Sequence, residues 1–273
     1  MLEAAVSNAP VFLLAACRCL ALILTLPLFS SRTVPRMAKI ALAGYMAYFI
    51  FPHISLSSGA YSGYSAYISP SGNFTLDYVF LLAGEAMIGI ITGLIIQVIF
   101  AAFSTAGQFF AFQMGLSASE VYDSLSQVEN PLMGQFFNFM AMLIFLQNRW
   151  LQQLFLYGLT ESFRAVNAFS IVSSTGFMAE FMMSSLTLLF KDALIIALPI
   201  MSSLFLINVS VGILSKAAPQ MNLLSEGFPI LMLTAFFLIS VLVPQFWRFF
   251  ERCFADGFGL IEKMIMRLGG AVP

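Results

Sequence analysis

The sequence has very little charge for its length. Only 9% of its 273 residues are Asp, Glu, Lys or Arg, whereas 60% are apolar. Ordinary soluble domains carry about 25% charged residues. So few charges cannot cover a water-facing surface, so most of this surface must face lipid or other protein chains. This composition excludes a soluble enzyme, and we expect one domain over residues 1–273.

Basic clusters, histidines and paired cysteines are also scarce. The net charge is −1 and the 12 Lys and Arg residues are scattered, which gives no case for nucleic-acid binding. The one histidine, His53, follows Pro52, and we expect no catalytic or metal-binding role for it. Cys17 and Cys19 have no second pair to complete a zinc site, so we interpret them, with Cys253, as buried apolar residues. No cofactor is expected.

Six apolar segments predict an all-α fold, because no strand-like alternation competes with them. They cover residues 10–30, 37–51, 78–103, 132–147, 181–214 and 228–250. The first segment lacks a basic start and is interrupted by Arg18, so we interpret it as a membrane helix and not as a secretory signal. The expected architecture is a membrane-associated bundle of long, kinked helical hairpins.

These segments do not match a single bilayer thickness. Residues 181–214 would extend about 50 Å as one helix, whereas the hydrocarbon core is about 30 Å thick. The distribution of basic residues is also inconsistent. Residues 32–39 predict a cytoplasmic first loop, yet 104–131, which should also be cytoplasmic, contain no Lys or Arg. The chain is therefore not expected to be an ordinary bilayer-threaded bundle.

Four charged residues lie within or beside the apolar segments: Arg18, Glu85, Lys191 and Asp192. Because a charge in hydrocarbon costs several kcal/mol, such residues face a partner or a wet cavity. They could form a proton or ion relay, or they could pair helices or subunits. The second interpretation is favoured, because no chain of carboxylates and histidines accompanies them.

Small and polar residues recur every four positions in the third segment. Glu85, Gly89, Gly93 and Gln97 form a gently drifting stripe on one helix, and two glycines four apart permit close helix contact. The stripe predicts a packed interface. In the fifth segment, Pro199 is expected to kink the helix.

Phenylalanine and methionine are unusually frequent, at 30 and 16 residues. Phe109, Phe110, Phe112 and Met114 cluster just after the third segment. Flexible, soft methionine can seal around irregular shapes. The cluster is therefore either a gasket in a conduit or ordinary packing, and the residues alone leave both open.

Residues 212–230, GILSKAAPQMNLLSEGFPI, resemble the signature of the FliR family of flagellar type III export-gate proteins, which the injectisome SctT-type proteins resemble in turn. Residues 18–35, 84–93 and 107–131 agree with the family in the same order, so the resemblance covers nearly the whole chain. Its most specific part runs from residue 219 to 229. Leu231, where the family usually has a basic residue, and residues 148–150 depart from the family pattern.

The resemblance implies a non-enzymatic role in a hetero-oligomer. FliR-like proteins join FliP and FliQ in a closed helical assembly, contact FlhB, and pass transiently unfolded flagellar subunits across the bacterial inner membrane at the base of the flagellar basal body. Much of that assembly lies above the bilayer plane, with only part of its surface facing lipid. This would account for the mismatched segment lengths.

The resemblance also implies roles for two sets of residues. Residues 107–123 become a plug loop, made mobile by two glycines and sealed by bulky side chains: Gly107, Phe109, Phe110, Phe112, Met114 and Gly115. Residues 219–229 become a tight turn, shaped or held by Pro219, Gln220, Asn222, Gly227, Phe228 and Pro229.

Two other functions remain as alternatives. A small-molecule or ion transporter would need a polar site near the bilayer midplane, often at broken helices, and Asp192 and Pro199 are the weak hints of one. An intramembrane enzyme would need a catalytic constellation, and neither a histidine cluster nor a Ser–Lys or paired-Asp pattern stands out.

Overall fold

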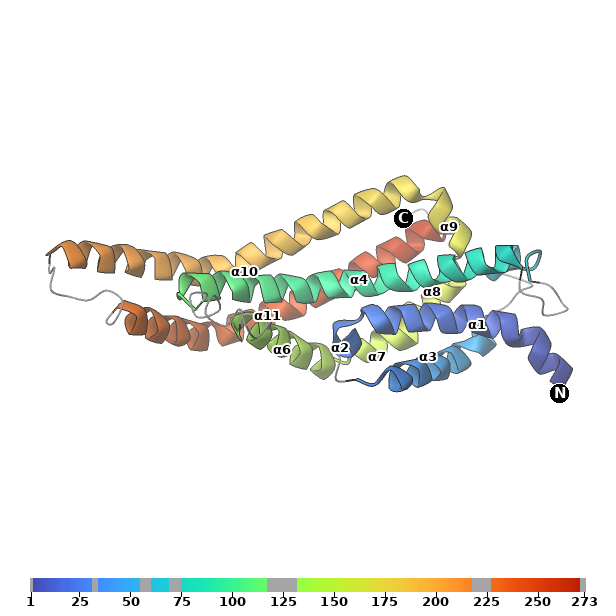
Figure 1. Cartoon of the computed structure of the whole chain (residues 1–273). Coiled ribbons are helices and arrows are strands. Elements are labelled where there is room, and N and C mark those ends of the chain that lie inside the picture. The colour runs from blue at the N-terminus through green and yellow to red at the C-terminus, as the bar shows by residue number, and fades with distance from the viewer. Residues whose placement is uncertain are drawn as a thin grey trace. The chain divides into compact units, whose positions relative to one another are not determined.

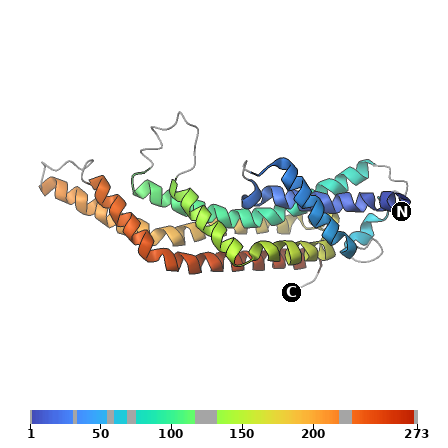
Figure 2. The ribbon, with the colours of Figure 1, turned by 90° about the horizontal axis from the view of Figure 1, so that it is seen from below.

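The computed structural model describes residues 2–30, 34–54, 60–68, 75–116, 132–217 and 227–270. All regular structure in these ranges is helical, which confirms the predicted all-α class (Figures 1 and 2). The longer helices are α1 (Leu2–Thr25), α3 (Arg36–Ile50), α4 (Leu76–Gln113), α6 (Leu132–Gln147), α10 (Thr175–Ala217) and α11 (Phe228–Leu268). The short ones are α2 (Pro27–Ser30), η1 (Phe51–His53), η2 (Ala60–Tyr64), α7 (Trp150–Gln153), the π-helical η3 (Leu154–Gly158), α8 (Leu159–Ala165) and α9 (Ala168–Ser173).

Each of the six apolar segments is helical, the first as α1 and α2, and the helices α1, α4, α10 and α11 each extend several residues beyond the predicted bounds. α4, α10 and α11 contain 38, 43 and 41 residues, and each is long and apolar enough to cross a membrane. The helix α10 continues through Pro199, and α11 through Pro244. α4 runs ten residues past the expected end at 103. The expectation of a loop from Gly107 to Gln113 is therefore wrong.

The described chain divides into two compact units. Unit 1 comprises Met1–Val98, Asn148–Ser185 and Ala255–Pro273, and unit 2 comprises Ile99–Gln147 and Leu186–Phe254. The helices α4, α10 and α11 each contribute residues to both units. A single domain over residues 1–273 stays a prediction.

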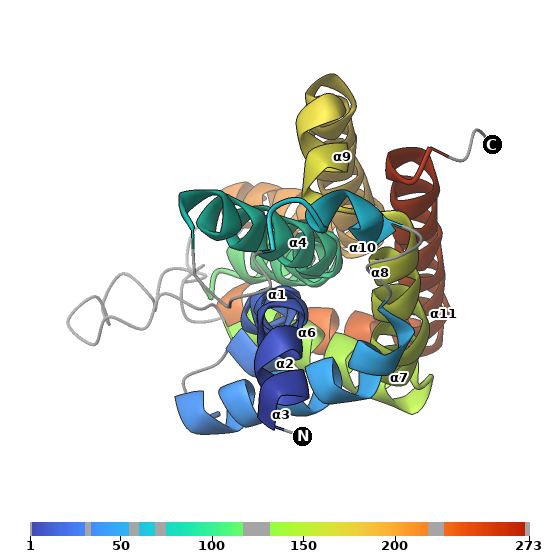
Figure 3. The ribbon, with the colours of Figure 1, turned by 90° about the vertical axis from the view of Figure 1, so that its right-hand side faces the viewer.

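In unit 1, helix α1 lies between α3 and the first part of α4 (Figure 3). Its inward face is apolar, with Leu14, Ala15 and Leu22 fully buried. The short helices η2 and α8 contact each other in the same unit. Burial of these apolar faces, at about 25 cal/mol per Å², is the main favourable contribution to the stability of unit 1.

The core of unit 2 is built from phenylalanine rings of α4, α6 and α11. The ring centroids of Phe103 and Phe250 are 4.0 Å apart, and those of Phe110 and Phe137 are 5.0 Å apart. Further pairs continue the cluster through Phe100, Phe145, Phe246 and Phe254. Edge-on and tilted ring pairs contribute about 0.5–1.5 kcal/mol each beyond the area that they bury. The high phenylalanine content is therefore partly explained by this core.

Candidate functional site

Arg18 is at the centre of a fully buried polar network in unit 1. Its side chain has no exposed surface. The Nε atom donates to Glu85 Oε2 at 2.7 Å, Nη1 donates to Ser162 Oγ at 3.1 Å, and Nη2 donates to the Val166 carbonyl at 2.9 Å. The guanidinium group thus joins helix α1 to α4, α8 and the residue that ends α8.

Glu85, the partner of Arg18, also accepts two tyrosine hydroxyls. The Tyr61 hydroxyl donates to Oε2 at 2.7 Å, and the Tyr64 hydroxyl donates to Oε1 at 2.6 Å. The Tyr64 oxygen in turn accepts the backbone N–H of Ala168 at 2.5 Å. Both carboxylate oxygens are therefore satisfied, which is the condition under which a buried ion pair is tolerated.

Aromatic rings close the network against water. The guanidinium carbon of Arg18 lies 4.3 Å from the centroid of the Phe163 ring and 5.9 Å from that of Tyr61. Burial, reinforced by the charge of Glu85, raises the pKa of Tyr61 and of Tyr64 well above its ordinary value. Both hydroxyls remain proton donors over the physiological range. This closed arrangement favours the structural interpretation of Arg18 and Glu85 over a relay.

Two glycines of the predicted stripe lie where α4 crosses α1. A Cβ atom on Gly89 would lie 2.9 Å from the Cβ of Ala21 and closer still to the Arg18 carbonyl oxygen. A Cβ atom on Gly93 would collide with Thr25. The missing side chains let the two backbones approach closely enough for Arg18 to reach Glu85.

Gln97 does not share this contact, since its side chain is exposed. A spacing of four residues advances about 40° around the helix at each step, so Gln97 lies about 120° from Glu85. Within this chain, the close contact of α4 with α1 therefore includes Gly89 and Gly93 but not Gln97. The part that these residues play in contacts between subunits stays a prediction.

The last turns of α4 carry the residues predicted to form a plug. Gly107 lies in the helix interior against α6, because a Cβ atom there would be 2.5 Å from the Met133 carbonyl oxygen. It is a close contact between helices and not a hinge. Phe110 is fully buried in the phenylalanine core, whereas Phe112 on the opposite side is 73% exposed.

Met114 and Gly115 end the helix. Met114 is fully buried, and Phe109 is half-buried. Gly115 has a φ of 77°, and the N–H groups of Gly115 and Leu116 donate to the carbonyls of Phe112 and Ala111. This is a Schellman motif, in which glycine takes the left-handed conformation that other residues rarely adopt. The Phe228 ring lies against Gly115.

The other residues predicted from the sequence do not belong to the buried network or to the end of α4. Lys191 is exposed on α10, and Asp192 is half-buried, with the Cys253 thiol donating to its Oδ2 atom at 3.6 Å. Gly227 is buried, while Phe228 and Pro229 form the start of α11. Pro219, Gln220 and Asn222 lie outside the described residues, so the tight turn stays a prediction.

Elsewhere in the described part of the structure, side chains give no sign of a metal centre. Cys19 and Cys253 are buried and Cys17 is half-buried, and none of the three is joined in a disulfide. No group of three or more His, Cys, Asp or Glu side chains in the described part of the chain could hold a metal ion.

Several members of the buried network could not be predicted from the sequence. Tyr61 and Tyr64 lie in a linker rich in Ser, Gly and Tyr, and neither Ser162 nor Val166 stands out by charge or motif. The one available signal was the pair of tyrosines three positions apart, which share one side of a helical turn. Their rings are 4.9 Å apart at their centroids.

These features define a class: an all-α protein whose described residues include three helices of membrane-spanning length and composition. Residues 9–257 match the family described as "Bacterial export proteins, family 1", and the chain belongs to that family. It is 29% identical over 263 residues to the flagellar biosynthetic protein FliR of Escherichia coli K12, covering 92% of this chain and 91% of that protein. It is 32% identical over 235 residues to FliR of Bacillus subtilis 168, covering 85% of each.

An injectisome-type relative is found as well. The surface presentation of antigens protein SpaR of Shigella sonnei is 29% identical over 171 residues, which is 62% of this chain and 65% of that protein. The resemblance to FliR, with a likeness to injectisome proteins, is thereby confirmed.

Proposed function

We propose that this chain is a non-enzymatic subunit of the flagellar type III protein export gate. It forms, with FliP-like and FliQ-like subunits, the channel for unfolded flagellar proteins across the bacterial inner membrane at the base of the basal body. A FlhB-like protein contacts the same complex. The similarity to FliR over nine-tenths of both chains carries this proposal.

The uncovered apolar surface supports a role within an assembly. In the most apolar stretches of α10 and α11, only 22% and 17% of the residues are buried within the chain. Large side chains such as Phe205, Leu206, Leu233 and Phe237 are more than half exposed. Apolar area of this extent needs lipid or neighbouring subunits to cover it.

Extraction of the complex in mild detergent tests the proposal. After co-expression with FliP-like and FliQ-like proteins, we expect the chain to elute in a hetero-oligomer with a mass well above its own 30.0 kDa. Expressed alone, it should aggregate, because its apolar faces lack their cover. Mass measurement of the intact complex distinguishes a hetero-oligomer from an aggregate of this chain alone. A stable 30.0 kDa monomer that binds a small solute would instead support the transporter.

The end of α4 is the part of the chain that we propose as the seal. Phe112 is exposed and free to contact neighbouring chains, while Phe110 and Met114 anchor the turn in the core of unit 2. We expect Phe112→Ala to leave the fold within about 0.5 kcal/mol of wild type and to raise the leak of small ions severalfold. Ion conductance of cells expressing the assembled complex measures the effect.

Phe110→Ala is the matched control, since it removes the same ring two positions away. It should destabilise unit 2 by about 3–5 kcal/mol, because it leaves a cavity in the phenylalanine core. If Phe112→Ala assembles normally and conducts no more than wild type, the seal does not lie at Phe112.

A further inference from the structure

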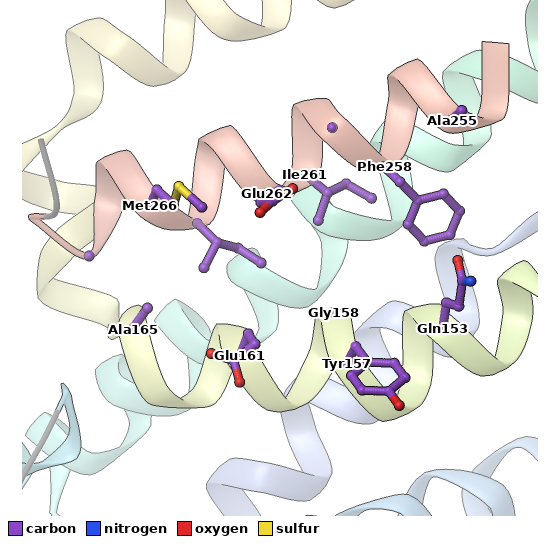
Figure 4. A pocket seen from close by; sticks show the side chains of 13 residues that line it. Gln153, Tyr157, Gly158, Glu161, Ala165, Ala255, Phe258, Ile261, Glu262 and Met266 are labelled. Carbon is purple, nitrogen blue, oxygen red and sulfur yellow. The ribbon is translucent and has the colours of Figure 1, made fainter. Parts of the chain in front are cut away.

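A groove of about 820 Å³ lies in unit 1 between two helical walls (Figure 4). One wall consists of residues 153–165, from the end of α7 through η3 and α8. The other consists of residues 255–268 of α11 and Gly269, which follows the helix. Ile261 and Ile265 are buried along the second wall. The twelve steps of about 1.5 Å from residue 153 to residue 165 give the first wall a length of about 18 Å, which is a little over three turns of a docked helix.

Small residues leave the groove open to a close approach. Gly158 and Ala165 lie on the first wall, and Ala255 and Gly259 lie on the second. A Cβ atom added to Gly259 would meet nothing within 4 Å, and one added to Gly158 would meet only its own helix turn. Small residues are what permits the backbone of another helix to approach in apolar surroundings.

The first wall also contains the π-helical turn η3, Leu154–Gly158. Its apolar residues Leu154 and Phe155 are buried in the unit, and Tyr157 and Gly158 line the groove. Single π-helical turns within α-helices are rare overall, but those that occur are often found at functional sites. The irregular backbone thus falls on the wall that a docked chain would contact.

The charge of the groove restricts what can occupy it. Glu161 and Glu262 extend from opposite walls (Figure 4), and none of the thirteen lining residues is Lys, Arg or His. Arg164, which pairs with Glu161 at 2.9 Å, is exposed outside the lining. An anionic lipid headgroup would be repelled by these carboxylates, whereas a cation on a docked helix would be attracted by both.

We propose that this groove binds one helix of a partner subunit, and that a Lys or Arg on this helix lies between Glu161 and Glu262. Small or apolar residues on the same helix face would fill the space beside Gly158 and Gly259. The inference rests on the proposed function, because it requires a neighbouring chain in an assembly.

The test uses the detergent-extracted complex with co-expressed FliP-like and FliQ-like subunits. Intact-mass measurement should show that the double reversal Glu161→Lys/Glu262→Lys retains at least about tenfold less of one partner subunit, since close charge pairs at an interface become repulsive. The neutral variant Glu161→Gln/Glu262→Gln should lose less of this partner subunit than the double reversal. Gly259→Trp, which fills the groove, should lose the same partner subunit.

Matched controls lie on α10. Glu180 is exposed, and a Cβ atom on Gly176 would meet nothing within 4 Å, so Glu180→Lys and Gly176→Trp repeat the chemistry outside the groove. A compensating Lys→Glu or Arg→Glu change in the lost partner's helix should restore its retention with the double reversal. Protease resistance equal to wild type shows that each variant is folded.

The outcomes separate the inference from the proposed function. If wild type assembles and the groove variants retain every subunit, the groove proposal is overturned and the proposed function stands. If instead those variants change only the amount of bound phospholipid, the groove is a lipid site and the proposal again fails. If wild type binds no partner, both fail together.

Discussion

Replacing Arg18 by methionine is expected to unfold unit 1 or to bring it close to unfolding. The change leaves the Glu85 carboxylate buried with two tyrosine hydroxyls and no cation. Removing one partner of a buried ion pair costs about 3–5 kcal/mol, against a total stability of about 5–15 kcal/mol for a typical protein. The loss of stability is measured by heating the protein in detergent and monitoring the protease resistance of unit 1.

Two companion variants show that the loss arises from the unpaired charge. The double variant Arg18→Met/Glu85→Met removes both charges and should recover much of the stability, because apolar replacements of buried pairs are often neutral. Arg18→Lys should remain impaired, since one ammonium group cannot reproduce the fork that reaches Glu85, Ser162 and Val166. Wild-type stability of Arg18→Met would show that the network contributes little.

The second large effect is expected from single methyl groups at helix crossings. Gly89→Ala places a Cβ against the Arg18 carbonyl and Ala21, and Gly107→Ala places one 2.5 Å from the Met133 carbonyl. Because backbone atoms cannot move aside as a flexible side chain can, we expect a cost of about 1–3 kcal/mol or more at each site. Unfolding of the extracted complex measures both variants.

Gly44→Ala is the control, and we expect it to raise the stability instead of lowering it. It lies within helix α3, and its added Cβ would meet nothing within 4 Å. Alanine should therefore stabilise this helix by about 0.5–1 kcal/mol, because glycine loses more conformational freedom on folding. If all three variants shift the unfolding temperature equally and in the same direction, then helix propensity and not close packing governs these positions.

The sequence predicted the helices well because apolar length is a local property. All six segments appear as helices, and the membrane-associated all-α class follows directly from composition. The end of α4 was missed for the same reason: residues 104–113 contain Ser, Gly and Gln, which weaken an apolar signal. The helix nevertheless continues, because Phe110 packs against Phe137 of α6 and Met114 is buried. Gly115 then ends the helix with a Schellman motif.

The candidate site was only partly visible in the sequence. Arg18 and Glu85 stood out, because charges in apolar segments are costly, but their pairing across 67 residues could not be derived from spacing. The tyrosines came from a stretch that resembled an ordinary linker. Gln97 was grouped with Glu85, Gly89 and Gly93 because a spacing of four residues is close to the 3.6 residues of one helical turn. Over three such steps the difference adds up, so Gln97 no longer lies on the same side of the helix.

The buried network also has a consequence for biosynthesis. Arg18 is translated early, but Glu85 follows 67 residues later and the Val166 carbonyl 148 residues later. At about 5–20 residues per second, roughly 7–30 s pass before the ribosome has produced every group that Arg18 bonds. Until Glu85 has been made, the first helix carries a cation without its partner, and such a charge is better accommodated in water than in hydrocarbon. The full set of hydrogen bonds to Arg18 can therefore form only after residue 166 of the 273 has been made.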